Sequence, residues 1–66
     1  MNPLEQDWER SQRELRELRV HLGVSIDELA RRSGIERSRI SRAERGYVRL
    51  EQEEIERLHG ALPGDP

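Results

Sequence analysis

Arginines are the residues of this 66-residue sequence whose type and spacing could do chemistry. All twelve Lys or Arg positions are Arg, and seven of them fall within residues 31–49, against two acids. Residues 1–30 carry four Arg against seven acids, and residues 50–66 carry one against five. A block of +5 between blocks of −3 and −4 predicts a strongly sided potential, although the net charge is only −2. Guanidinium groups bind phosphate and pair in bidentate fashion with guanine.

The composition excludes several classes of protein. There is no Cys, so disulfide frameworks and thiolate metal sites are excluded. With 32% hydrophobic residues, so short a chain is expected to form one domain without an enclosed catalytic pocket, and we expect no enzyme and no small-molecule ligand. His21 and His59 have no neighbouring ligand pattern, so no metal or cofactor is expected. The short uncharged stretches argue against a membrane span or signal peptide and favour a cytoplasmic protein.

The elements that must position the arginines are predicted to be helices. Asn2, Pro3 and Glu5 form a helix start, and Gly23 is expected to end the first helix. Its apolar residues follow a heptad register, in which Ser11 fills the one polar place: Leu4, Trp8, Leu15, Leu18 and Leu22. Charge pairs are expected on its solvent face: Glu9 with Arg13, Arg10 with Glu14 and Arg13 with Glu17.

Three shorter helices are expected to follow. Ser25 and Glu28 form a capping box, and Gly34 offers the positive φ that a tight turn requires. The helices are predicted over residues 26–33, about 36–45 and about 51–62. No segment alternates like a strand, so the predicted fold class is all-α: a compact four-helix domain over residues 1–66 with an extended first helix.

Small residues fall where a helix-turn-helix needs them. Ala30 lets two helix axes approach, Gly34 makes the turn and Ile40 fills the angle between the helices. With these residues in place, the sequence resembles the phage-repressor and Cro-like family of DNA-binding domains, often called XRE. The matching stretches are LRELRVHLGVSIDELARRSGIERSRISRAERG and the later IERLHGAL, within residues 15–62. The chain would then consist of an N-terminal helix extension over residues 2–14 and a helix-turn-helix over residues 25–45.

The resemblance implies a transcriptional regulator that binds double-stranded DNA as a homodimer, with the helix over residues 36–45 in the major groove. The family's base-reading positions fall on Arg37, Ser38 and Arg42, and its flanking phosphate positions fall on Arg39, Arg45 and Arg49. The helical repeat supports this assignment in part. With Ile40 and Ala43 turned inward, it places Ser38, Arg42 and Arg45 on the outer face.

The sequence departs from the family pattern in three places, and the first two predict modest affinity. Ile26 stands where the family usually has a Gln that holds a phosphate. Glu36 stands where Ser or Thr usually caps the recognition helix, and its charge repels phosphate. The family commonly has a fifth helix, for which only residues 63–66 remain, so another segment is expected to cover that edge of the core.

Two further pairs of residues are expected to have structural roles. Glu44 is a charged residue on the inward side of its helix, and the resemblance implies that it pairs with Arg19. Leu4 and Trp8 precede the family resemblance but continue the apolar register of the first helix. Either they cover the end of the fourth helix locally, or they meet their symmetry mates in a dimer interface.

The favoured hypothesis is therefore a sequence-specific DNA-binding regulator of the repressor type. The alternative is a protein-interaction module, such as an antitoxin-like or polymerase-binding accessory factor, that keeps the helix-turn-helix scaffold without specific DNA binding. The arginines of the third helix distinguish the two hypotheses. DNA binding needs these arginines to be free, whereas a protein partner would engage the acidic ends of the chain.

Overall fold

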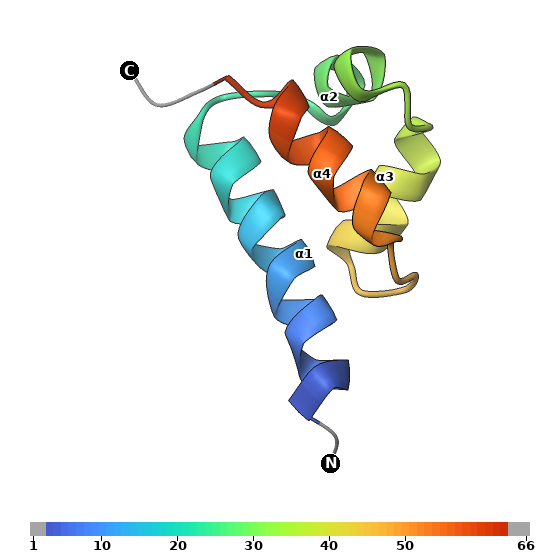
Figure 1. The fold of residues 1–66 in the computed structure, drawn as a ribbon. Helices are drawn as coiled ribbons and strands as arrows, with labels where there is room; N and C mark the ends of the chain where they lie inside the picture. The colour runs from blue at the N-terminus through green and yellow to red at the C-terminus, as the bar shows by residue number, and fades with distance from the viewer. Residues whose placement is uncertain (1–2, 64–66) are drawn as a thin grey trace.

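The computed structural model describes the backbone of residues 3–63 and the side chains of residues 7–63. Four helices follow one another along the chain: α1 (Pro3–His21), α2 (Ile26–Ser33), α3 (Arg37–Glu44) and α4 (Gln52–Ala61) (Figure 1). No strand occurs within the described backbone, and the predicted all-α fold is confirmed. The bounds of α2 are those predicted, and α3 and α4 are each one residue shorter at both ends than expected.

The core lies where all four helices converge, and it is built from small and medium aliphatic side chains. Ile40 of α3 is its most deeply buried member, at 1% exposure. The other buried apolar residues are Leu15, Val24, Leu29, Ile35, Ala43, Leu50, Leu58 and Leu62. Burial of one such side chain contributes about 1.5–3 kcal/mol, so this cluster accounts for most of the favourable free energy available to so small a fold.

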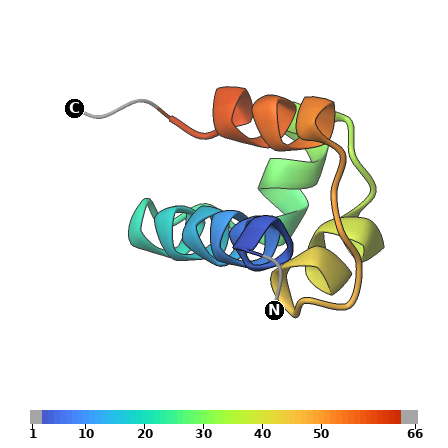
Figure 2. The ribbon, with the colours of Figure 1, turned by 60° about the horizontal axis from the view of Figure 1, so that its bottom comes forward.

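The helices lie on two opposite sides of the molecule, and α2 connects the two sides. α4 runs along one side, and α1 and α3 lie next to each other on the opposite side (Figure 2). This arrangement leaves an outer face on α3 that α4 does not cover. The outer flank of α1 continues that face, so both helices are accessible from the same direction.

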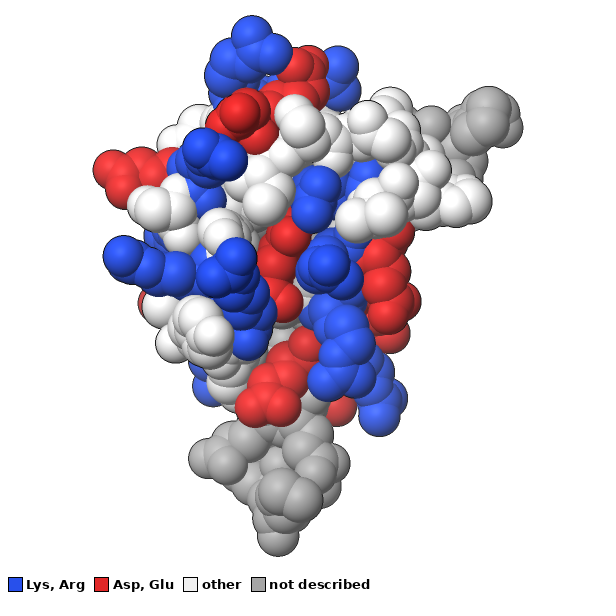
Figure 3. All heavy atoms as spheres, turned by 180° about the vertical axis from the view of Figure 1, so that it is seen from behind, with Lys and Arg blue, Asp and Glu red and all other residues white. Residues whose placement is uncertain are grey.

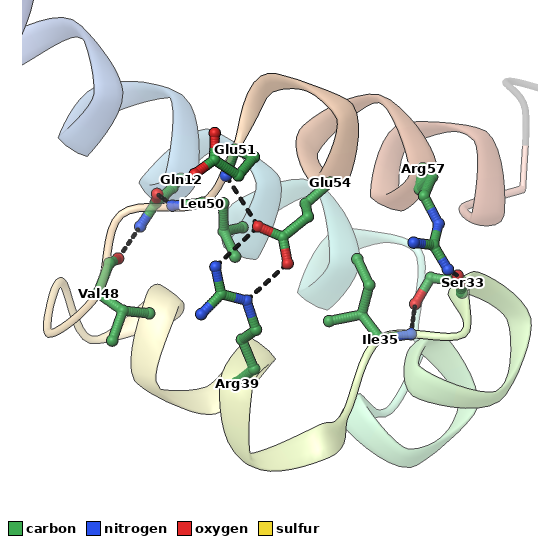
Figure 4. Close-up of polar contacts among 9 residues, drawn as sticks. All are labelled: Gln12, Ser33, Ile35, Arg39, Val48, Leu50, Glu51, Glu54 and Arg57. Carbon is green, nitrogen blue, oxygen red and sulfur yellow. Dashed lines mark hydrogen bonds and ion pairs between the residues drawn. The ribbon is translucent and has the colours of Figure 1, made fainter.

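The turn between α2 and α3 depends on Gly34. Ser25 caps the start of α2 by accepting a hydrogen bond from the Glu28 N–H at 3.0 Å. The predicted capping box is only half formed, because the Glu28 carboxylate pairs with Arg31 and Arg32 instead. Gly34 ends α2 at φ 77°, and a Cβ there would lie 2.8 Å from Nη2 of Arg57. That guanidinium donates to the Ser33 carbonyl at 2.7 Å and ties α4 to the turn (Figure 4).

The first helix contains the two residues that the family resemblance did not account for. Trp8 is half-buried beside an open hollow that it shares with Leu50, Gln52 and Ile55. These partners lie at the start of α4, whereas local cover was expected at its end. The side chain of Leu4 lies outside the described residues.

Among the described helices, none is long and apolar enough to cross a membrane.

Candidate nucleic-acid interface

The outer face of α3 is polar and basic because its apolar residues are all used in the core. Ile40 and Ala43 are buried at 1% and 3% exposure, which fixes the rotation of the helix. The side chains that were expected on the opposite side are exposed: Ser38, Arg42 and Arg45. Arg37, at the start of α3, is exposed as well. Arg49 is exposed in the loop that follows. Five of the six candidate DNA-binding residues are therefore exposed, those on α3 because of the rotation of the helix.

Arg37 is linked to the first turn of α2. Its Nε lies 3.0 Å from Oδ1 of Asp27, and both side chains are well exposed. The pair neutralises Asp27, which would otherwise repel a phosphate at the start of α2. The contact uses one of five guanidinium donors, so Arg37 keeps donors for a base edge.

Arg39 differs from the other candidates because it is held within the molecule. Its Nε and Nη2 donate to the two carboxylate oxygens of Glu54 in α4, at 2.6 and 2.8 Å (Figure 4). Glu54 also accepts from the Glu51 N–H at 2.8 Å. The bidentate bond from Arg39, helped by that backbone bond, lowers the pKa of Glu54 to about 2. Arg39 thus joins α3 to α4 and is not a free phosphate ligand.

Arg19 and Glu44 meet between α1 and α3, as the family resemblance implied. Arg19 Nε lies 2.7 Å from Glu44 Oε2, and Nη2 lies 2.8 Å from Oε1. A third donor, Nη1, reaches the Val24 carbonyl at 2.8 Å. The two side chains are only 12% and 10% exposed, and the bond to Glu44 raises the pKa of Arg19. This pair fixes the position of α3 against α1.

Gln12 is a positioning residue that the sequence did not reveal. Its Nε2 donates to the Ala43 and Val48 carbonyls at 2.8 and 2.9 Å, and its Oε1 accepts from the Leu50 N–H at 2.7 Å. The side chain is 2% exposed and joins α1 to the loop between α3 and α4 (Figure 4). That loop carries Arg49, so one buried amide sets the path of a basic surface segment. A helical repeat of three and four residues through Leu15 would have placed Gln12 inward.

Basic side chains gather on the face formed by α1 and α3. Seen from behind, this face carries one group of Arg side chains over α3 and another over α1, with acidic side chains between them (Figure 3). A face of this kind attracts a polyanion locally, although the whole chain is slightly acidic. Within the part of the chain that is described, no His, Cys, Asp and Glu side chains group as a metal site.

Comparison with known proteins agrees with this geometry. A helix-turn-helix family model matches residues 15–66. The chain belongs to the XRE family, of the Cro and C1 type. No match was found among the curated proteins or the solved structures. XRE proteins are DNA-binding transcription regulators, and the predicted family membership is confirmed.

Two departures from the XRE pattern have visible consequences. Glu36 precedes α3 without forming a side-chain cap, so the first N–H groups of α3 receive no help from it. Ile26, in place of the usual Gln, is half-buried against the core. The start of α2 is acidic, with Asp27 and Glu28 in its first turn. The start of α2 therefore lacks the phosphate-holding Gln of the family pattern and carries negative charge instead.

Proposed function

We propose that this XRE-family chain is a sequence-specific transcriptional regulator that places α3 in the major groove of double-stranded DNA. Arg37, Ser38 and Arg42 read base edges in this proposal, and Arg45 and Arg49 bind flanking phosphates. The observation that carries it is the exposed basic side of α3 opposite buried Ile40 and Ala43. Arg forks at the start and middle of a groove-bound helix are suited to guanine O6 and N7.

A selection of bound fragments from random duplex DNA, repeated at several salt concentrations, tests the proposal. The retained fragments should share a short motif. Arg42→Ala should relax the preference at one position of that motif, by about 1–3 kcal/mol of discrimination. Arg45→Gln should weaken binding to all sequences alike and reduce the salt slope by about one. Equal losses on motif and random DNA for Arg42→Ala would overturn its base-reading role, and a loss confined to the motif for Arg45→Gln would overturn its phosphate role.

Arg39 has a different role from the other arginines, because its guanidinium is paired with Glu54. A flanking phosphate must compete with Glu54 for this guanidinium. Arg39 therefore contributes to DNA binding through the position of α3. Its replacement should lower the free energy of unfolding more than it lowers the salt slope.

The functional unit is proposed to be a homodimer with Leu4 and Trp8 at its interface. One copy of α3 contacts only a few base pairs of the duplex, whereas two-fold symmetry presents two recognition helices about 34 Å apart. The open hollow beside Trp8 supports this assignment, because an aromatic side chain at its edge is half-buried within one copy. Failure of the chain to bind any duplex at low salt would favour the protein-interaction module instead.

A further inference from the structure

We infer that α1 is a second DNA-contacting element, whose flank beside α3 binds a phosphate of the duplex backbone. The inference rests on the proposed function, because it requires α3 to hold the duplex. It adds Arg13, which precedes the residues matched by the family model, to the proposed interface.

The flank of α1 beside α3 has a positive balance, with two exposed arginines against one acid, whereas the other flank is acidic apart from Arg10. Glu9 and Arg13 border a hollow shared with α3, and Arg16 Nε lies 3.8 Å from Oε1 of Glu44. A repeat of about 100° per residue places Asp7 and Glu14 on the other flank. Asp7 borders the separate hollow at the start of α4, which agrees with this placement. The basic side of α1 therefore faces the same way as α3.

Arg13 and Arg45 border the same hollow from two different helices. The hollow has a volume of about 250 Å³ and lies between α1 and the end of α3. That volume is several times the roughly 30 Å³ share of one water molecule, so it admits a phosphate group. Both arginines are exposed, and neither forms an ion pair within the described part of the chain. The charge pairs expected for Arg13 with Glu9 and Glu17 do not form there.

The acids around this hollow leave a positive balance. Glu44 is already paired with Arg19 at 2.7 Å and lies within 3.8 Å of Arg16, so its charge is compensated. Glu9 is then the one carboxylate at the hollow that opposes Arg13 and Arg45. α1 and α3 lie on the same side of the molecule, so a duplex held along α3 extends past this hollow (Figure 2). That side carries two groups of basic side chains, one over α3 and one over α1 (Figure 3).

A salt titration of the full chain with a mixed-sequence duplex tests the inference. Arg13→Gln should weaken binding and lower the slope of log K against log salt by about 0.9. The matched control is Arg10→Gln, because Arg10 is also an exposed Arg of α1 but lies about 60° around the helix, between Asp7 and Glu14. Arg10→Gln should leave the slope unchanged. Glu9→Gln should tighten binding, since it removes the opposing carboxylate.

The outcomes separate the inference from the proposed function. Arg13→Lys keeps the positive charge and should retain the parent's slope, which distinguishes a phosphate contact from a loss of folding. If the parent binds and Arg42→Ala changes its sequence preference, but Arg13→Gln and Arg10→Gln behave alike, only the inference is overturned. If the parent binds no duplex at low salt, both the proposed function and the inference are overturned.

Discussion

The ionisation of Glu54 contributes to stability, because its carboxylate ties α3 to α4 and caps the backbone of α4. Its pKa is lowered from 4.5 to about 2 by Arg39 and by the Glu51 N–H. A carboxylate with a lowered folded-state pKa stabilises the fold fully above its ordinary pKa, and that stability is lost as the pH falls toward the folded value. The window for Glu54 is therefore about pH 4.5 to 2.

Glu54→Gln should lower the free energy of unfolding at pH 7 and flatten its fall between pH 5 and about 2. The glutamine oxygen still accepts a hydrogen bond but carries no charge for Arg39. Urea titrations at several pH values measure the difference between parent and variant, which should shrink toward zero near pH 2. Glu53→Gln changes an exposed neighbouring position, and its free energy of unfolding should fall with pH as that of the parent does. A constant difference across the whole pH range would show that the ion pair is not the source.

Arg19 and Glu44 should be energetically coupled, because their side chains are nearly buried and share two hydrogen bonds. Loss of one partner of such a pair costs about 3–5 kcal/mol by stranding the other charge. A double-mutant cycle with Arg19→Met and Glu44→Met should therefore leave the double variant more stable than the two single losses imply. Urea unfolding in sucrose keeps the single variants folded.

The matched control for this cycle is Arg16, whose side chain is 55% exposed and lies 3.8 Å from the same carboxylate. Arg16→Met should change stability by less than about 1 kcal/mol, because the pair is open to solvent. Additive losses for Arg19→Met and Glu44→Met would mean that the two groups do not stabilise each other.

At the scale of elements, the loop between α3 and α4 depends on a single side chain of α1. Gln12→Leu should leave two backbone groups without this partner: the carbonyl of half-buried Val48 and the N–H of Leu50, which is 4% exposed. Each orphaned buried group costs about 1–3 kcal/mol. Hydrogen exchange should show the Leu50 amide losing more protection than the amide of Leu58, which lies in the core. Equal losses at the two amides would contradict a specific role for Gln12.

The control for Gln12 is Gln52→Leu, at an exposed position in the first turn of α4. This variant has the same change of chemistry but removes no described hydrogen bond, so the Leu50 amide should exchange as in the parent. A loss of protection at Leu50 in both variants would point to a general effect of the added apolar surface.

The helices could be predicted because their signals are local. Ser25, Gly34 and Pro63 act within a few residues of the boundaries that they set, and the positions of Ile40 and Ala43 fixed the outer face of α3. The partners of Arg39 and Gln12 could not be predicted, because they lie 15 and 31–38 residues away in the sequence. Their contacts depend on how whole helices are placed. The sequence therefore predicts which side of α3 is exposed but not that Arg39 is already occupied.

The buried face of α1 differs from the heptad prediction at one position. A heptad register places Ser11 in the seam, yet the structure buries Gln12 at 2% exposure and leaves Ser11 half-buried. Consecutive residues lie about 100° apart around a helix, so Gln12 faces the flank of α1 that packs against α3 and the following loop, beside the heptad seam. The apolar residues of α1 do not mark the flank that carries Gln12. Its burial becomes apparent only from its contact with the α3–α4 loop.

For the whole molecule, the open question with the sharpest test is the association of two copies. Sedimentation over a wide concentration range should show the parent forming dimers and Trp8→Ala shifting them toward monomers, because Trp residues are enriched at the centres of interfaces. The control is Tyr47→Ala, which removes a 72% exposed aromatic side chain from the α3–α4 loop and should leave the mass unchanged. A circular-dichroism melt of each variant reports whether it remains folded. A parent that stays monomeric at high micromolar concentration would overturn the dimer, whereas a Trp8→Ala variant that unfolds without a change in association would assign Trp8 to cover of the start of α4.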